Sequence, residues 1–356
     1  MYRIPQPDTQ TVSIFCQNRA NELRPVIVSF LNGATFQLSV RNRGEVQIGV
    51  RPNTMTRRFL AQLLQGNNLE IYLAWPYTRQ KKFIKQLQQH AYPDDLIFKP
   101  LGAGIYDTHF VGELMPYDDF NEICYEIFVN RGYETLDKAN FIRSTGINIC
   151  PYCGKDEVIE SDRSKRQIDH YLPKRKYPFF ALSYFNLIPA CDLCNEVPNK
   201  GVKDPIVERV QGCGIMQPYG LTESIVRFHI DIADVNVYEP DNFDIILGFN
   251  DLHYLDGYDK FFDLSDRYKS CKQEASEDYI RLAEFKDLSR YSGLQMDSQW
   301  LHRAYTTIMG YTPSSDKPTL KRLHRMRKDF FEQLNLLRQP QPYYVKGHGN
   351  QPVILD

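Results

Sequence analysis

Residues 150–203 read CPYCGKDEVIESDRSKRQIDHYLPKRKYPFFALSYFNLIPACDLCNEVPNKGVK. Two Cys-x-x-Cys pairs, Cys150/Cys153 and Cys191/Cys194, bracket an insert of 37 residues. Four thiolates in this spacing suit a tetrahedral zinc ion, which accepts all-cysteine sites readily. Two unrelated pairs of thiols or a redox Cys-x-x-Cys are the alternatives, but thioredoxin-like motifs need one such pair, not two. The insert is longer than in a zinc ribbon, so we expect it to be a folded unit.

The insert and its end carry four polar side chains in a fixed order. These are Asp169 and His170 in an extended stretch, Asn186 after an apolar run, and Asn195 after the last cysteine. A carboxylate suits a hard divalent ion, and an imidazole can take a proton from water. Each residue alone has an ordinary explanation as a surface, packing or turn residue. Their order inside a four-cysteine frame favours a common site.

This segment resembles the HNH endonucleases, the ββα-metal superfamily, and looks like bacterial members that carry a zinc knuckle. The resemblance covers about residues 145–220. It rests on Asp169-His170, Asn186-Leu187 and Cys191-x-x-Cys194-Asn195, with Lys200 downstream. Family members often have a compact Cys-Asn-x-x-Lys, whereas Glu-Val-Pro-Asn separates Asn195 from Lys200 here. Asn199 is therefore a rival for the role of Asn195.

The resemblance implies a role for each matching residue. His170 would be the general base that activates water, and Asn186 would brace the hairpin and orient the histidine or its neighbouring backbone. Asp169 and Asn195 would hold one catalytic Mg²⁺ or Mn²⁺. A structural zinc would be held by Cys150, Cys153, Cys191 and Cys194. The expected products are a 5′-phosphate and a 3′-hydroxyl.

The charge pattern of this segment suits a polyanion. Residues 162–176 carry six Lys/Arg against two Asp. We expect nucleic-acid phosphates to contact Lys174, Arg175, Lys176 and Lys200; a solvated loop is the alternative. A second basic patch lies at residues 321–328, where an exposed helix face is as good an interpretation as nucleic-acid contact.

Length and composition exclude several classes of protein. The chain has 356 residues and a net charge of -1, which suggests two or three domains and excludes a wholly basic nucleic-acid coat. Hydrophobic residues make up 42% of the chain, so wholesale disorder is excluded too. No apolar run approaches the roughly 18 residues that span a membrane. Eight cysteines are too few for a disulfide scaffold, and we expect a cytoplasmic protein.

We expect an α+β protein with a central ββα-metal HNH module. The predicted parts are an N-terminal mixed α/β domain (1–115) for docking or regulation, the module with its preceding helices (116–220), a mainly helical C-terminal α+β region (221–339) and a loose tail (340–356). Hydrophobic patterns predict strands at 26–31, 35–40, 45–50 and 69–75. They predict helices at 54–64, 78–90, 118–131 and 134–144, and a further helix that opens at Asn195.

The expected function is that of a metal-dependent HNH endonuclease that hydrolyses DNA. The resemblance and the large flanking regions favour a regulated effector of a bacterial antiphage defence system, with a protein partner or activator subunit. No Gly-rich phosphate loop is present, so an ATPase would have to be another protein. The alternatives are a zinc-stabilised nucleic-acid-binding subunit with a dormant site, and a nuclease that acts on RNA.

Overall fold

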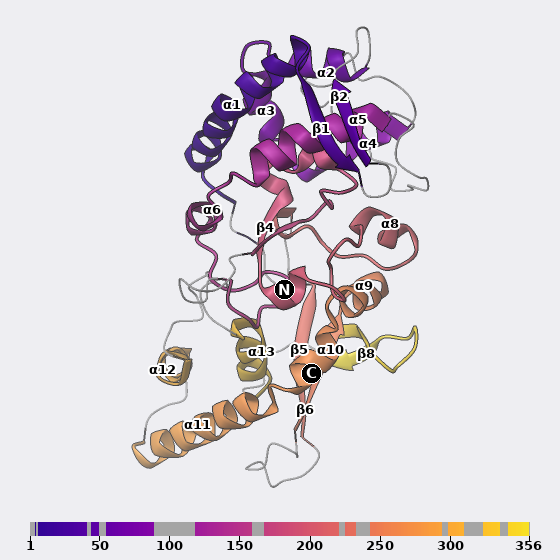
Figure 1. Ribbon diagram of the computed structural model, residues 1–356. Coiled ribbons are helices and arrows are strands. Elements are labelled where there is room, and N and C mark those ends of the chain that lie inside the picture. Colours follow the sequence, from indigo (N-terminus) through magenta and orange to yellow (C-terminus); the bar gives the residue numbers. More distant parts are fainter. Residues whose placement is uncertain are drawn as a thin grey trace.

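The computed structural model of the protein describes residues 4, 6–40, 44–49, 55–88, 118–158, 167–220, 225–232, 243–293, 298–309, 323–334 and 341–355. This part of the chain is mixed α+β, as the sequence predicts. Figure 1 shows that the N-terminal helices, the segment with the cysteine pairs, and the C-terminal sheet with its helices follow one another along a long axis. None of the described helices is long and apolar enough to cross a membrane.

The N-terminal region is mostly helical and carries one β-hairpin. Its elements are α1 (Thr9–Leu31), β1 (Thr35–Val40), β2 (Gly44–Gly49), α2 (Met55–Leu63), α3 (Asn68–Leu73) and α4 (Tyr77–Gln88). The predicted strands at 35–40 and 45–50 are confirmed as an antiparallel pair, and the predicted helices at 54–64 and 78–90 are confirmed. The strands predicted at 26–31 and 69–75 are wrong, because both segments are helical.

Helix α1 shows why the first of these predictions fails. Its Asp8 cap accepts a hydrogen bond of 2.7 Å from the amide of Thr11. Its buried residues recur three and four positions apart: Cys16, Ala20, Leu23, Ile27 and Phe30. This helical stripe outweighs the local β-preference of residues 26–31, since burial of a whole face decides the conformation.

Two helical segments lead into the cysteine pairs. They are α5 (Asp118–Cys124), continued without a break by the π-helix η1 (Tyr125–Tyr133), and α6 (Lys138–Thr145). The predicted helices at 118–131 and 134–144 are thus confirmed. Cys124 is fully buried, as expected of a core thiol.

The central segment contains two short strands, β3 (Gln167–His170) and β4 (Leu187–Ala190), which pair antiparallel with Asp169 opposite Ile188. The short 3-10 turns η2 (Pro178–Phe180) and η3 (Tyr184–Asn186) lie in the connection between the strands. The one-turn helix α7 (Asp192–Asn195) follows β4, and α8 (Pro205–Val210) and the 3-10 turn η4 (Pro218–Gly220) come next. Asn195 therefore ends a helix that it was expected to open.

The C-terminal region combines an antiparallel sheet with helices. The sheet order is β5-β6-β7-β8, with β5 (Val226–Ile232), β6 (Phe243–Phe249), β7 (Gln341–Val345) and β8 (Val353–Leu355). The helices are α9 (Leu252–Phe262), α10 (Leu264–Lys269), α11 (Lys272–Tyr291), α12 (Ser298–Met309) and α13 (His324–Leu334).

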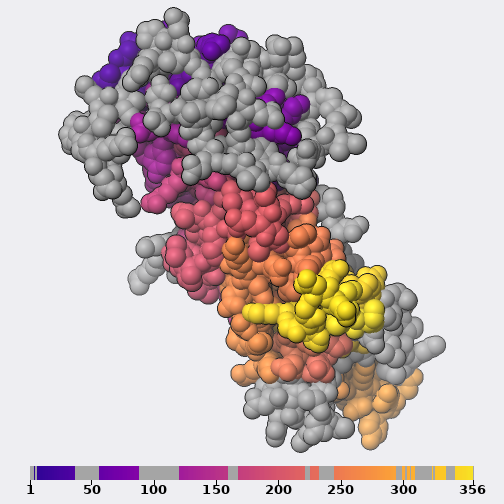
Figure 2. All heavy atoms as spheres, turned by 90° about the vertical axis from the view of Figure 1, so that its right-hand side faces the viewer, coloured from indigo at the N-terminus to yellow at the C-terminus, as the bar shows by residue number. Residues whose placement is uncertain are grey.

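The expected loose tail is in fact part of this sheet, which corrects the prediction for residues 340–356. Tyr343 and Val345 of β7 are buried, and β7 pairs with both β6 and β8. The ammonium of Lys346 lies 3.1 Å from Asp266 and 3.3 Å from Asp259. Figure 2 shows the hairpin lying against the helical segment that precedes α11.

One hydrophobic core runs through the three regions that were expected to be separate domains. The main cluster of buried side chains contains residues from Ile4 to Phe330. The Tyr72 hydroxyl of α3 donates a hydrogen bond to the carbonyl of Phe179 in the central segment. On the other side, the Tyr268 hydroxyl of α10 donates to the carbonyl of Cys153 at 2.5 Å. The central segment is thus packed between the other two.

The second basic patch is largely paired within the protein. Arg325 pairs with Asp329, Arg327 with Asp278, and Lys328 with Glu332. These ion pairs fit the interpretation as a helix face better than nucleic-acid contact. Lys321 and Arg322 lie outside the described residues.

Candidate functional site

The two cysteine pairs meet in one buried cluster. The four Sγ atoms of Cys150, Cys153, Cys191 and Cys194 all lie within 4.8 Å of one another. Cys150 and Cys153 lie in a turn closed by a hydrogen bond of 2.7 Å from the amide of Gly154 to the carbonyl of Cys150. Gly154 has a φ of +67°, the left-handed conformation that glycine adopts readily. Cys191 and Cys194 are contributed by the first turn of α7.

The sulfur geometry suits a tetrahedral metal ion such as zinc. Zinc–sulfur bonds of about 2.3 Å in a tetrahedron place the sulfurs about 3.8 Å apart. The Sγ atoms of Cys153 and Cys191 are 3.8 Å apart. The buried four-cysteine group could therefore hold a metal such as zinc, and the predicted convergence of the pairs is confirmed.

Arg267 of α10 brings positive charge to this cluster. Its guanidinium donates a hydrogen bond of 3.2 Å to Cys194 Sγ and lies 2.5 Å from the Asp156 carboxylate. Four thiolates around one divalent ion carry two excess negative charges, which a neighbouring guanidinium would offset. The sequence spacing gave no hint of this residue, which lies 73 positions beyond Cys194.

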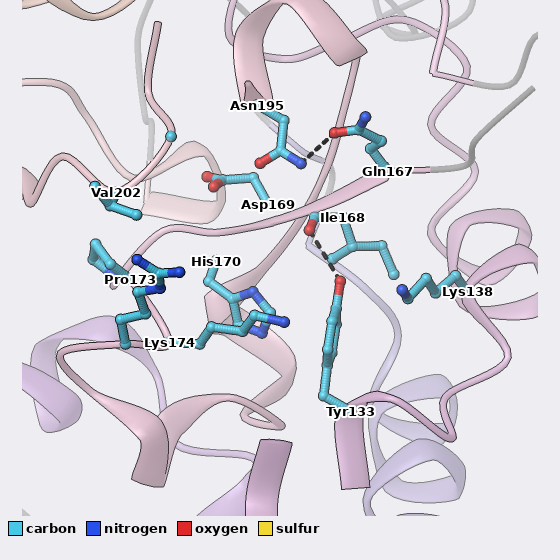
Figure 3. Close-up of a pocket in the computed structure, with 12 residues that line it drawn as sticks. Tyr133, Lys138, Gln167, Ile168, Asp169, His170, Pro173, Lys174, Asn195 and Val202 are labelled. Atoms are coloured by element: carbon cyan, nitrogen blue, oxygen red, sulfur yellow. Dashed lines mark hydrogen bonds between the residues drawn. The ribbon is translucent and has the colours of Figure 1, made fainter. Parts of the chain in front are cut away.

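Asp169 and His170 lie on β3 beside a cavity of about 500 Å³. Figure 3 shows the two side chains on opposite sides of the strand, with Asp169 and Asn195 pointing toward one another. Alternation along a strand explains this arrangement. The cavity is lined by Tyr133, Lys138, Gln167, Ile168, Asp169, His170, Pro173, Lys174, Arg175, Asn195, Gly201 and Val202.

The imidazole of His170 is held in a defined orientation. Its Nε2 lies 3.0 Å from the carbonyl oxygen of Ala181, which can only accept a hydrogen bond, so Nε2 carries the proton. Nδ1 then has the lone pair, and none of the described residues hydrogen-bonds to it. The ring of Tyr133 packs edge-on at 4.3 Å between centroids. Burial and the charge of Lys174 lower the pKa of His170 to about 3, so the ring is neutral at physiological pH.

Both carboxylate oxygens of Asp169 have partners in the protein. The Tyr152 hydroxyl donates to Oδ2 at 2.6 Å, and the Lys200 ammonium lies 2.9 Å from Oδ1. Lys200 also donates to the carbonyl of His170 at 2.7 Å and has no exposed surface. The structure therefore places Lys200 inside the site behind Asp169, which corrects its expected place on the nucleic-acid surface. An ammonium group this deep is buried only because it has a carboxylate partner.

The three asparagines named in the sequence analysis have distinct positions. Asn195 lines the cavity, and its Nδ2 donates to Gln167 Oε1 at 2.5 Å, which leaves its amide oxygen on the side of Asp169. Its rival Asn199 does not line the cavity and donates to the carbonyl of Leu193. Asn186 is buried outside the cavity, where it holds the backbone of Leu172 and Phe180.

Of the remaining basic residues, some line the cavity and one does not. Lys174 and Lys138 of α6 lie on different sides of the cavity (Figure 3), and Arg175 also lines it. Lys174 pairs with Glu134 at 2.9 Å, while Arg175 is exposed and forms no ion pair with any described residue. Lys176 does not line the cavity and pairs with Asp204 at 2.8 Å.

Several residues of the site were missed at the sequence level. Gln167 could have been found, because it lies two positions before Asp169 and so shares its face of the strand. Tyr152 stands between the cysteines of the first pair, which hinted at proximity but not at its bond to Asp169. Tyr133 and Lys138 come from distant helical segments, and no local pattern indicates them.

The oxygen donors of the cavity fit a hard cation in chemical type. The Asp169 carboxylate and the Asn195 amide oxygen are ligands that Mg²⁺ and Mn²⁺ accept. Lys200 already neutralises the carboxylate, which leaves the protein itself little net negative charge for such an ion.

No known protein family, no curated protein and no solved structure matches this chain in sequence or fold, so the function has to be inferred from the site itself.

Proposed function

We propose that the protein is a metal-dependent HNH endonuclease that hydrolyses phosphodiester bonds of DNA. The observation that carries the proposal is a neutral His170 of fixed tautomer in a cavity that is also lined by lysine and arginine side chains. The side chains of Asp169 and Asn195, which point toward one another, line the same cavity. A neutral imidazole can serve as a general base, oxygen ligands can hold a divalent ion, and basic side chains can bind phosphates, so the cavity contains groups that metal-dependent phosphodiester hydrolysis can use.

His170 would act as the general base through Nδ1. Its proton on Nε2 is donated to Ala181, so the other nitrogen is available for the proton of an attacking water. Burial and the charge of Lys174 lower the pKa of His170. A bound phosphodiester brings negative charge that offsets Lys174, and we expect it to raise the pKa of His170 and make it a stronger base.

The cationic walls would position the strand that is cut. Lys138, Lys174 and Arg175, which all line the cavity, can contact phosphates that flank the scissile bond. Asp169 and Asn195 would hold one Mg²⁺ or Mn²⁺, which when bound offsets charge on the phosphate and on the leaving 3′-oxygen. Tyr152 and Gln167 hold these two ligands in place. The zinc proposed for the four cysteines would be structural.

The test is a cleavage assay on plasmid, linear and single-stranded DNA and on RNA, with Mg²⁺ and with Mn²⁺. We expect cleavage of DNA by the wild type and its loss in His170→Ala. His348→Ala is the matched control, because His348 is exposed in the turn between β7 and β8. Full cleavage by His170→Ala would refute the assignment of the protein as an HNH endonuclease. Cleavage of RNA alone would identify RNA, and not DNA, as the substrate.

A dormant nucleic-acid-binding subunit is the second candidate. It is favoured by one observation: the buried ammonium of Lys200 forms an ion pair with the Asp169 carboxylate, the proposed metal ligand. Tight DNA binding without cleavage of any substrate would establish it in place of the nuclease.

We further infer a regulated effector of a bacterial antiphage defence system that works with a protein partner. What supports this is the packing of the site between two large flanking regions without an evident role in hydrolysis. Cleavage that appears only when a co-purified subunit is added is the expected result. Strong activity of the isolated chain would contradict the need for a partner.

A further inference from the structure

Lys200 is a buried positive charge at the heart of the site. Its ammonium has no exposed surface and contacts both Asp169 Oδ1 and the carbonyl of His170. Its backbone is fixed as well, since the Lys200 amide donates to the carbonyl of Cys194 at 3.2 Å and the Lys203 amide donates to the carbonyl of Lys200 at 2.8 Å. The charge is thus held in place by the loop that follows α7.

The charges around the cavity add up to an environment that is unfavourable for a lone divalent cation. Asp169 is the one carboxylate among the described lining residues, and Lys200 neutralises it. The lining also carries the cations Lys138, Lys174 and Arg175, of which Lys174 is paired with Glu134 at the rim. Protein sites that bind Mg²⁺ or Mn²⁺ rely on carboxylates and substrate phosphates for their negative charge. Here the protein alone lacks that charge.

We propose that the site takes up its divalent ion together with nucleic acid, and that Lys200 imposes this coupling. The inference rests on the proposed nuclease function. A phosphate in the cavity would supply the negative charge that Asp169, neutralised by Lys200, does not provide, and it would add an oxygen ligand to those of Asp169 and Asn195. The coupling is reciprocal, so the ion strengthens nucleic-acid binding by the same factor. In this way the chain would avoid holding a loaded metal centre when no substrate is present.

The first test measures Mn²⁺ binding, by electron paramagnetic resonance of the free ion, in the His170→Ala variant saturated with zinc. This variant is expected not to cut, so a short DNA duplex stays intact during the titration. We expect the Mn²⁺ affinity to rise by at least about tenfold when the duplex is present, within the usual range of coupling between two ligands. Equal affinities with and without the duplex would overturn the inference.

The second test assigns the coupling to Lys200. In the same background, Lys200→Gln keeps a hydrogen-bond donor but removes the charge, and we expect it to raise Mn²⁺ affinity without DNA and to shrink the ratio between the two conditions. Lys203→Gln is the matched control, because this ammonium belongs to the same loop but donates to the carbonyl of Lys260. If Lys200→Gln keeps the same ratio of Mn²⁺ affinities with and without DNA as the His170→Ala background, as Lys203→Gln is expected to, Lys200 does not impose the coupling. The ratio with Lys200 intact tests the coupling even if Lys200→Gln does not fold.

A parallel cleavage assay separates this inference from the proposed function. Cleavage of DNA by the wild type together with tight, DNA-independent Mn²⁺ binding would refute the coupling and leave the endonuclease in place. Absence of cleavage with every metal and substrate would refute the endonuclease, whatever the binding ratio is.

Discussion

Replacing Asn186 by alanine should destabilise the connection between β3 and β4, which begins directly after His170. The Asn186 side chain accepts a hydrogen bond of 2.7 Å from the amide of Leu172 and donates to the carbonyls of Leu172 at 3.2 Å and Phe180 at 3.0 Å. Each bond contributes about 1 kcal/mol net, so the loss is about 3 kcal/mol of unfolding free energy. Leu172 and Phe180 are fully buried, so water cannot easily replace the lost partners, and the cost rises above this figure.

The loss can be measured by urea unfolding followed through the fluorescence of Trp75. This ring lies 6.4 Å from that of Phe180, so it reports on the affected region. A Trp300→Phe background removes the other tryptophan, which belongs to a separate buried cluster. Asn199→Ala is the matched control, because it removes one hydrogen bond near the surface and should cost about 1 kcal/mol or less. A loss below about 1 kcal/mol in Asn186→Ala, or one equal to the control, would refute the reasoning.

Three further predictions concern the four-cysteine cluster and His170. Elemental analysis should find about one zinc per chain, and markedly less in Cys191→Ser; an unchanged zinc content would contradict the four-cysteine site. Arg267→Gln should lower the zinc affinity, measured by competition with a colorimetric chelator, by about 10- to 100-fold. Lys269→Gln should leave the zinc affinity unchanged, because the Lys269 ammonium pairs with Asp266. Because the pKa of His170 is lowered from 6.5 to about 3, only the unfolded chain takes up its proton between these values. Stability should therefore fall from pH 7 to pH 5 by about 2 kcal/mol more in the wild type than in His170→Gln.

The sequence was most informative where spacing and chemistry coincide. The two Cys-x-x-Cys pairs predicted a common site, and their sulfurs meet in the structure. The strand at Asp169 and His170 also follows from local pattern, as does the helix that buries Cys124. For the strand and the helix, a residue's neighbours within four positions decide its environment, and for the cysteines the spacing within each pair indicates a shared metal site.

The rest depended on contacts between distant segments. The partner of Lys200 is Asp169, 31 positions earlier, and nothing near Lys200 distinguishes a buried ammonium from an exposed one. The strand predicted at 69–75 fails for the same reason, because Leu69, Tyr72 and Leu73 form a helical face that packs against other helices. The loose tail was predicted from Pro340, Pro342 and glycines, but pairing with β6 makes it a strand. Tertiary packing overrode the local preference in each case.

The continuous core has a consequence for the order in which the protein acquires its structure during synthesis. The central segment packs on Tyr72, which is translated before it, through Phe179, and on Tyr268, which is translated after it, through Cys153. Segments fold as they leave the ribosome, N-terminal parts first. The cysteine cluster can therefore reach its final packing only after Arg267 and Tyr268 have emerged, nearly three quarters of the way along the chain. A truncated polypeptide that stops earlier would lack the contacts of Arg267 with Cys194 and of Tyr268 with Cys153, so its cysteine cluster would be incompletely packed.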